Sequence, residues 1–354
     1  MSEAPTTRRK IAVVLFNLGV PEDQASVRPF LRNLFADPAI IGLPAAIRIP
    51  LAAGISAARA KSARANYARM GGGSPLLSET ENQRAALTAA LRPAYPGDIV
   101  ELFIAMRYWR PFTEDTARAV ASFAPDEIVL LPLYPQFSTT TTGSSLTAWK
   151  KAYKGPGRTH TVCCYPVAAD LVAAHAEAIR AAWAKAGSPA EPRLLFSAHG
   201  LPLKVIEAGD PYQNQVERTC IAVAEALAKS SGRSWDWRVC YQSRVGPMKW
   251  LGPATPDAIA EAGKAGRAVV ITPIAFVSEH IETLVELDHD YAKVAEAAGC
   301  SAYIRVPALG AADRFITGLA TSVARALEGA GTRPDSPPCA GFSQCPHARE
   351  TPTA

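Results

Sequence analysis

Short apolar runs alternate along this chain with stretches of helical periodicity, and this alternation constrains the fold more than any other feature. The apolar runs are "IAVVLFNLG", "IVELFIAMRY", "EIVLLPLYP", "RLLFSAHG", "RVCYQSRVG" and "AVVITPIAF". A strand that is apolar on both sides is typical of a parallel sheet covered by helices on both faces. The pattern therefore predicts an α/β protein built on parallel sheets.

The helical stretches and a weak internal repeat predict two such sheets. Helical periodicity occurs in "TENQRAALTAALR", "TEDTARAVASF", "AADLVAAHAEAIRAAWAKAG", "YQNQVERTCIAVAEALAKSSG" and "IETLVELDHDYAKVAEAAG". "LFNLGVP" resembles "LFSAHGLP", and "IVLLPLYPQFSTTTTGS" resembles "VVITPIAFVSEHIETL". We expect one half at 8–150, a second at 151–310 and a helix at 311–330 that packs back on the first. The Pro-, Gly- and Ser-rich tail, 331–354, is predicted to be poorly ordered.

Composition and charge exclude several classes of protein. The net charge of +5 is mildly basic, and no Lys/Arg cluster is dense enough to indicate nucleic-acid binding. Seven cysteines without a CxxC pair do not indicate a disulfide framework. The apolar region 39–58 is interrupted by Pro44, Arg48 and Pro50, so we do not expect it to span a membrane. A cytoplasmic protein is the expectation, with an anionic small molecule or membrane surface as possible partner.

A dense acidic segment follows the last apolar run. "PIAFVSEHIETLVELDHDY" carries five acids between Glu279 and Asp290. Carboxylates in the first helical turn are favoured by the helix dipole, which accounts for Glu279 and Glu282. Glu282, Glu286 and Asp290 lie at i, i+4 and i+8, along one face of an α-helix. That line is either a working face or a solvated one.

Polar and aromatic side chains at other predicted strand ends are candidates for a site, because ligands of open parallel sheets bind beyond the carboxyl ends of the strands. His199 follows "RLLFSA", and "AMRYWRP" places Arg107 and Tyr108 in an equivalent position. Trp250 lies in the loop "SRVGPMKWLGP". For each residue a structural role remains the alternative: a histidine satisfied by backbone, core aromatics and a surface arginine.

Taken together, these motifs resemble the ferrochelatase family. "LLFSAHGLPLKVIEAGDPY", "QSRVGPMKWLGP" and "PIAFVSEHIETLVELD" are similar to its C-terminal half, and "NLGVP", "MGGGSPL", "MRYWRP" and "LYPQFSTTTTGSS" to its N-terminal half. The resemblance covers about residues 11–320. It implies two flavodoxin-like halves around a porphyrin cleft. The implied reaction, the last step of haem biosynthesis, inserts Fe²⁺ into protoporphyrin IX and releases two protons.

The resemblance also implies roles for individual residues. His199 corresponds to the family's active-site histidine, and Glu282 to its partner glutamate on the opposite wall; both are expected to act in catalysis and to contact the metal. Glu286 and Asp290 would continue a path for protons or metal. The other implied residues are His280 and Glu279 beside that path, Phe276, Tyr108 and Trp250 against the macrocycle, and Arg107 and Ser74 orienting the substrate or its propionates.

Two further expectations concern partners and cofactors. The region 39–64 resembles the family's pocket lip, and its apolar and basic residues suit peripheral contact with the inner face of an anionic membrane; an ordinary helical hairpin is the alternative. Some relatives carry a [2Fe–2S] cluster, which needs four thiolates. Here the tail offers only Cys339 and Cys345, and Thr139 stands at the internal position. We therefore expect no cluster and no required cofactor, although Cys163 or Cys164 could contribute a ligand.

Other functions remain open from sequence. The substrate could be coproporphyrin, or the enzyme could insert cobalt or nickel into another tetrapyrrole. A non-enzymatic porphyrin or haem carrier would keep the aromatics and arginines, but it would not need His199 paired with Glu282. The sequence does not distinguish a monomer from a homodimer, nor does it say whether His199 delivers the metal or accepts protons.

Overall fold

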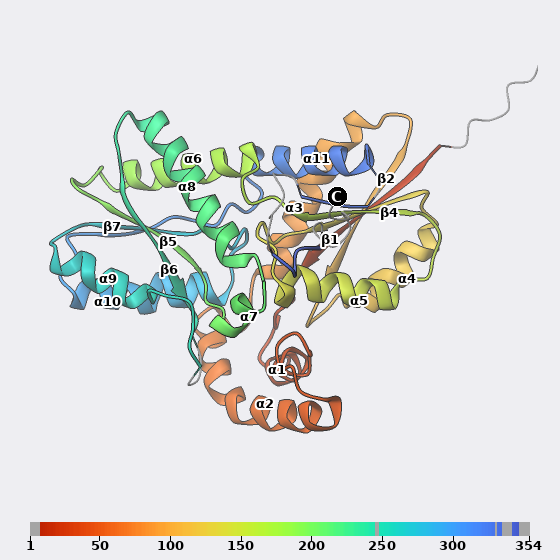
Figure 1. Ribbon diagram of the computed structural model, residues 1–354, viewed down its shortest axis with the longest axis horizontal. Coiled ribbons are helices and arrows are strands. Elements are labelled where there is room, and N and C mark those ends of the chain that lie inside the picture. The colour runs from red at the N-terminus through yellow and green to blue at the C-terminus, as the bar shows by residue number, and fades with distance from the viewer. Residues whose placement is uncertain (1–7, 245–247, 330, 335–341, 347–354) are drawn as a thin grey trace, which may run out of the picture.

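Two parallel sheets lie side by side in the computed structural model, which describes residues 8–244, 248–329, 331–334 and 342–346 (Figure 1). The first sheet has the strand order β2-β1-β3-β4-β9 and the second β6-β5-β7-β8. The strands are β1 (Lys10–Asn17), β2 (Ile99–Met106), β3 (Glu127–Pro132), β4 (Arg158–Cys164), β5 (Arg193–His199), β6 (Asp236–Gln242), β7 (Val269–Pro273), β8 (Tyr303–Arg305) and β9 (Gly331–Pro334).

The second sheet repeats the order of the first. Each begins with a central strand that pairs with the next strand on one side and with the one after that on the other. With β9 added, the first sheet has the flavodoxin-like order 2-1-3-4-5. The predicted α/β fold of two parallel halves is therefore confirmed.

Two predicted boundaries differ from the structure. β4 pairs with β3 of the first sheet, so that half continues past residue 150. The run "RTHTVCC" was not predicted as a strand because its first half is polar. The tail, predicted to be poorly ordered, begins with β9, which pairs with β4. Backbone pairing at a sheet edge orders a segment whose side-chain composition does not indicate a strand.

Side-chain alternation along β1 explains how both faces of the first sheet are covered. Ile11, Val13 and Leu15 pack in the cluster that contains side chains of α3 (Leu76–Leu91) and α11 (Asp313–Leu327). The intervening residues 12, 14 and 16 pack with side chains of α4 (Thr113–Phe123) and α5 (Ser144–Ala152) on the other face. A run apolar at every position is thus required by a sheet buried on both sides.

Helices also join the two halves. α6 (Ala169–Lys185) packs against α8 (Tyr212–Ser231) of the second half and against α11. On the other face of the second sheet, α9 (Thr255–Lys264) packs against α10 (Tyr291–Ala297). Two other short helices are η1 (Arg92–Ala94) and α7 (Leu203–Glu207).

Helices α1 (Val27–Phe35) and α2 (Ala45–Ala68) project from the two-sheet body as a separate layer (Figure 1). The sequence suggested a region interrupted by prolines, but α2 begins after Pro44 and continues through Pro50. Pro50 lies in the second turn, where it removes one backbone hydrogen bond without ending the helix. No helix in the described part of the chain is both long enough and apolar enough to cross a bilayer.

The segment after β7 departs from the predicted α-helix. Glu282–Asp290 forms a π-helix, η3, which continues into α10. Thr139–Gly143, the equivalent segment after β3, forms a second π-helix, η2. π-Helical segments are rare and often mark functional sites. The α-helical alignment expected for Glu282, Glu286 and Asp290 therefore does not hold.

Packing between α9 and α10 gives a test of the fold. A Cβ added at Gly263 would lie 2.3 Å from the carbonyl oxygen of Ala298, whereas one added at Gly54 in α2 meets nothing within 4 Å. Gly263→Ala should lower the free energy of unfolding by roughly 1–3 kcal/mol, as overpacking does. The matched control Gly54→Ala should leave it unchanged or raise it by up to about 1 kcal/mol. Urea denaturation measures both; equal effects would contradict the packing described.

Candidate active site

Two glycines, one after the first strand of each sheet, allow neighbouring strands to approach closely at their carboxyl ends. Gly19 follows β1 with a φ of +72°, and a Cβ there would lie 2.7 Å from the Cβ of Met106 at the end of β2. Gly200 follows β5, and a Cβ there would lie 2.9 Å from the carbonyl oxygen of Gln242 at the end of β6. The repeated Gly of "NLGVP" and "AHGLP" is thus required by close backbone approach at both carboxyl edges.

The segment between β7 and η3 reaches across to the first half. Val277 packs in the core of the first sheet. The Ser278 hydroxyl lies 3.2 Å from the side-chain oxygen of Gln83 in α3, and the Gln83 amide donates to the Val277 carbonyl. Glu282, the first residue of η3, is consequently positioned by contacts to both halves.

His199 and Glu282 are in direct electrostatic contact. Nε2 of His199, the last residue of β5, lies 3.6 Å from Oε1 of Glu282. Nδ1 of His199 lies 2.6 Å from the carbonyl oxygen of Gly200. A carbonyl only accepts, so Nδ1 carries the proton that donates there. Nε2 is therefore the nitrogen that can take up or release a proton towards the cleft.

The distance corrects one expectation from the family resemblance. A flat ring placed between two groups contacts each at about 3.5 Å, so its walls stand roughly 7 Å apart. At 3.6 Å, His199 and Glu282 cannot flank a macrocycle in this structure. The two side chains form one unit on one wall.

Two neighbouring imidazoles affect the charge state of Glu282. Burial alone would raise the pKa of Glu282, but the charges of His199 and His280 outweigh it and hold that pKa below its usual value. Nε2 of His280 lies 3.8 Å from Oε2 of Glu282. The ring of Phe276 packs edge-on against both imidazoles. Glu282 is thus an ionised carboxylate between two histidines, and Phe276 limits how far their rings can turn.

Glu286 lies one turn of η3 after Glu282 and is held by three hydrogen bonds. Its Oε2 accepts hydrogen bonds from Ser243 at 2.7 Å, from Gln242 at 3.2 Å and from Tyr291 at 3.3 Å. Burial first, and then the charge of Glu282, raise the pKa of Glu286. The two neighbouring carboxylates therefore have pKa values displaced in opposite directions, a pattern typical of sites that handle protons.

The other three acids are paired elsewhere. Glu279 and Asp288 both contact Arg305 of β8. Burial alone would raise the pKa of Glu279, but the Thr283 hydroxyl and Arg305 lower it. Asp290 forms an ion pair with Arg69, which follows α2, at 2.8 Å. Of the five acids, only Glu282 and Glu286 face the histidine.

The first half supplies a second cluster at the end of β2, and it changes the expected role of Tyr108. Tyr108 is 1% exposed and its hydroxyl donates to Oδ2 of Asp37 at 2.8 Å. Its ring is in the core, so it does not face a macrocycle in this structure. Arg107 is partly exposed and binds the same Asp37 oxygen at 2.7 Å and Ser144 at 2.7 Å. Sequence reasoning missed Asp37 because its region shows no motif.

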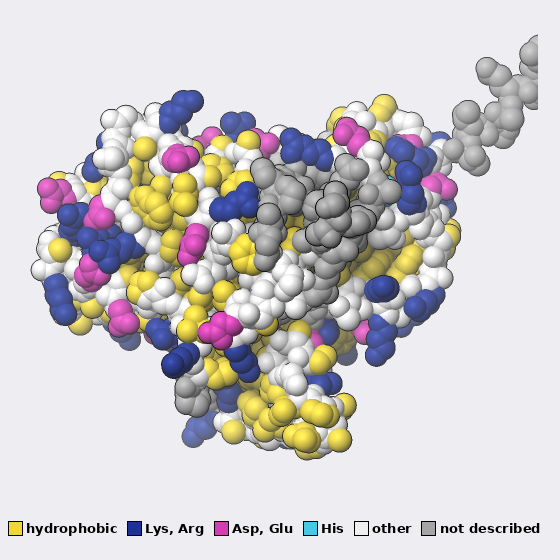
Figure 2. Space-filling view, in the orientation of Figure 1, with side chains coloured by type: hydrophobic (Ala, Val, Ile, Leu, Met, Phe, Trp, Pro, Cys, Tyr) yellow, Lys and Arg dark blue, Asp and Glu magenta, His cyan; other side chains and the backbone are white. Residues whose placement is uncertain are grey.

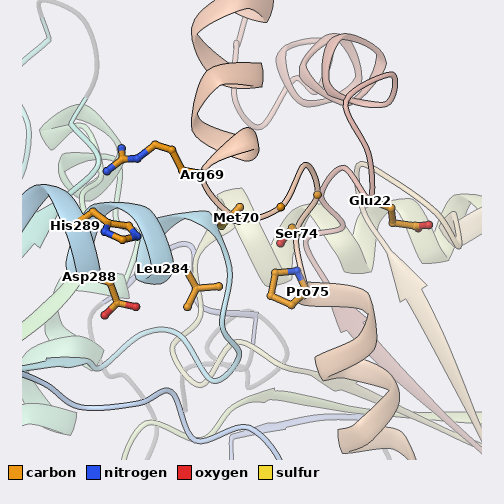
Figure 3. A pocket seen from close by; sticks show the side chains of 10 residues that line it. Glu22, Arg69, Met70, Ser74, Pro75, Leu284, Asp288 and His289 are labelled. Carbon is orange, nitrogen blue, oxygen red and sulfur yellow. The ribbon is translucent and has the colours of Figure 1, made fainter.

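Trp250 and Ser74 lie on different sides of the site. Trp250 packs close to Gly200, and its indole nitrogen is buried without a hydrogen-bond partner among the described residues. Ser74 lines a cavity of about 620 Å³ between the glycine-rich turn and η3 (Figure 3). The other lining residues are Glu22, Arg69, Met70, Gly71, Gly73, Pro75, Leu284, Asp288 and His289. Neither His199 nor Glu282 lines this cavity, so it is separate from their contact.

Three more polar residues interact with the pair or with Glu286, and no sequence motif marks them. Tyr212 donates to the backbone carbonyl of His199 at 3.1 Å. Burial and the charge of Glu282 raise the pKa of Tyr67. Ser243 follows β6 with a φ of +60°, a conformation that costs energy for a non-glycine residue. That conformation accompanies its hydrogen bond to Glu286.

Two buried cysteines of the first half are neighbours. Sγ of Cys163 and Sγ of Cys164 are 3.6 Å apart and both residues are buried. The Cys163 contact, burial and the charge of Cys345 all raise the pKa of Cys164, so its thiol is protonated in the metal-free protein. Within the described ranges no three His, Cys, Asp or Glu side chains are arranged to hold a metal ion. Cys339 lies outside the described residues.

Comparisons with known proteins identify the family of this chain. A model of the ferrochelatase family matches residues 10–327. A ferrochelatase from Caulobacter vibrioides (strain NA1000 / CB15N) is 65% identical over 315 residues, covering 89% of this chain and 90% of the relative. One from Phenylobacterium zucineum (strain HLK1) is 60% identical, covering 93% of this chain and 94% of the relative. The cobalt complex of the sirohydrochlorin chelatase SirB from Bacillus subtilis subspecies spizizenii aligns with a TM-score of 0.51 at 10% identity, covering 91% of this chain and 96% of that one, and bears on the fold alone.

The raised pKa of Glu286 predicts a pH-dependent stability difference. A carboxyl in an unfolded chain titrates near about 4.3. The folded protein binds its proton more tightly, so ionised Glu286 opposes folding at neutral pH and this opposition disappears as pH falls below that value. Glu286→Gln should therefore be more stable than the parent at pH 7, and the difference should shrink towards pH 5. Thermal unfolding across this range is the measurement; exposed Glu296→Gln is the control, and a pH-independent difference would refute the assignment.

Proposed function

The chain belongs to the ferrochelatase family, and from this premise we propose that it inserts Fe²⁺ into protoporphyrin IX at the His199–Glu282 pair. As a ferrochelatase it is an enzyme that inserts iron into a porphyrin. The observation that supports these residues is the 3.6 Å contact between Nε2 and an ionised carboxylate at a strand end. A porphyrin carrier would have no use for such a pair.

The proposed role of His199 is to accept pyrrole protons. A metal that enters the ring replaces two N–H protons, and a neutral imidazole is suited to receive them near pH 7. Nε2 is the nitrogen available for this because Nδ1 is bound to the Gly200 carbonyl. A proton on Nε2 forms an imidazolium, which the Glu282 carboxylate stabilises. The same carboxylate orients the ring for the next transfer.

Glu286 is the proposed next station for protons or metal. Its raised pKa lets it take up a proton more readily than an ordinary carboxylate does, and Ser243, Gln242 and Tyr291 hold its carboxylate in place. Asp290 lies at the far end of η3, half-exposed, where an ion from solvent can reach it after Arg69 moves aside. Glu279 is left out of this path because Arg305 binds it.

The donor set also suits transfer of the metal. The described residues offer His199, Glu282 and His280 near one another but no complete arrangement of three ligands. A complete protein ligand set would retain Fe²⁺, whose affinity for imidazole and oxygen donors is already appreciable. An incomplete one allows the four porphyrin nitrogens to take it. We also propose that no resident cofactor is required.

The projecting helical layer is proposed to contact a membrane surface. Figure 2 shows hydrophobic side chains gathered over α1 and α2, and the exposed large ones there are Ile40, Leu43, Ile47, Ile49 and Leu51. Exposed Arg59 and Lys61 lie on the same layer. Apolar residues beside cations suit an anionic bilayer, from which an apolar porphyrin would arrive. We place the protein at the inner face of the membrane.

Substitution of the reactive pair tests the proposed reaction. His199→Ala should abolish insertion while protoporphyrin binding changes by less than about tenfold, because binding rests on the apolar surface of the ring. Glu282→Gln should lower kcat by on the order of a hundredfold or more, and Glu286→Gln by less. Exposed Glu296→Gln should match the parent. Initial rates with Fe²⁺ or Zn²⁺ and each porphyrin give the answer, and near-normal turnover of His199→Ala would sink the assignment.

Vesicle binding tests the membrane proposal. Ile47→Glu should weaken binding to vesicles containing phosphatidylglycerol by about tenfold or more, since burying an isoleucine contributes roughly 1.5–3 kcal/mol. The control is Ile221→Glu on α8, whose isoleucine is exposed to a similar extent: 46% against 56% for Ile47. Co-sedimentation reports the bound fraction. If both variants lose binding equally, or neither does, the projecting layer is not the contact.

A further inference from the structure

Arg305 joins two acids that flank the reactive carboxylate in the sequence. Its Nε and Nη2 bind the two carboxylate oxygens of Asp288 at 2.6 and 2.8 Å, and its Nη1 binds Oε1 of Glu279. The same Glu279 oxygen accepts from the backbone N–H of Ala308 at 2.9 Å. Arg305 is only 15% exposed, so this is a largely enclosed clamp that uses the planar fork of the guanidinium on both partners.

The clamp spans the part of the chain that carries the chemistry. Glu279 lies three residues before Glu282, and Asp288 lies six residues after it, within η3. A second side chain of β8 acts on the same helix, because the Tyr303 hydroxyl donates to the carbonyl of Leu287 at 2.7 Å. Two of the three residues of β8 thus bind η3 and hold it in place.

A π-helix needs such fastening. Its hydrogen bonds are made at a wider spacing than those of an α-helix, and it persists where surrounding contacts hold it. If this segment relaxed to an α-helix, the side chains after Glu282 would rotate about the axis. Glu286 would then leave Ser243, and Glu282 would change its approach to His199. The ends held by Arg305 prevent that rotation.

We propose that Arg305 is a positioning residue for metal insertion: by binding Glu279 and Asp288 together, it holds η3 in the π-helical register that places Glu282 against His199 and Glu286 against Ser243. This inference rests on the proposed function. It assigns Glu279 and Asp288 to the same clamp, and so removes them from the path of protons and metal. It also gives a part in the reaction to β8, a strand far from His199 in the sequence.

A simpler role for Arg305 is to neutralise two enclosed acids and so to stabilise the fold. The structure contains a matched arginine for that comparison. Arg193, at the first position of β5, binds Asp236 at 2.8 Å and Glu261 at 3.3 Å and is 9% exposed. It lies at the opposite end of the strand from His199, about 20 Å away by strand rise. Loss of Arg193 removes a similar clamp without affecting η3.

The experiment measures kcat and KM with protoporphyrin IX and Fe²⁺ or Zn²⁺ for Arg305→Gln, Arg305→Lys, Tyr303→Phe and Arg193→Gln, each checked for folding. Arg305→Gln should lower kcat by about tenfold or more, as small misplacements of reacting groups do. Its KM for protoporphyrin should stay within about twofold. Arg305→Lys should recover part of kcat, and Tyr303→Phe should lower kcat less. Arg193→Gln should lower the unfolding temperature and leave kcat unchanged.

If Arg305→Gln folds poorly, a variant that leaves no acid unpaired still tests whether the clamp is needed for catalysis. In the combination Glu279→Gln, Asp288→Asn and Arg305→Met, no enclosed acid is left unpaired, yet the clamp is absent. We expect its kcat to remain low. Recovery of the parent kcat, or equal effects of Arg305→Gln and Arg193→Gln, would overturn the inference while leaving the proposed function intact. Failure of the parent protein to insert metal would instead refute the proposed function.

Discussion

The contact between His199 and Glu282 is the constraint around which the rest of the site is organised. It brings together the exit of β5 and the first turn of the π-helix that follows β7, two neighbouring strands of the second sheet. Parallel pairing places both exits at one edge. Gly200 allows the chain to turn there, and the segment from β7 crosses to α3 before it returns as η3. The reactive pair therefore exists only when both halves are assembled.

The five acidic residues after β7 have three different sets of partners. Glu282 and Glu286 face the histidine with pKa values displaced in opposite directions. Glu279 and Asp288 are held by Arg305, and Asp290 pairs with Arg69 after the projecting layer. Packing five acids without these partners would leave uncompensated charge in a partly enclosed region. Because these partners bind the other three acids, only the carboxylates of Glu282 and Glu286 remain available to His199.

Sequence reasoning predicted the parts of the fold that depend on apolar pattern. Six strands and the repeated half followed from short, mainly apolar runs, whereas β4 begins with polar residues and β8 has only three residues. The spacing of Glu282, Glu286 and Asp290 did not reveal a π-helix, because such spacing places side chains near one another in either helix. Tyr108 and Arg107 are adjacent in sequence, but only the fold shows that one is buried and the other partly exposed. His199 and Glu282 were identified as partners, but their distance and their common wall depend on tertiary contacts.

A crystal structure with metal-free protoporphyrin bound tests the central claim, that His199 and Glu282 act as one unit. The account predicts both side chains on the same face of the macrocycle, with Nε2 and the carboxylate still within about 4 Å of each other and Nε2 directed at a pyrrole nitrogen. A macrocycle lying between the two residues, with their reactive atoms about 7 Å apart or more, would contradict it.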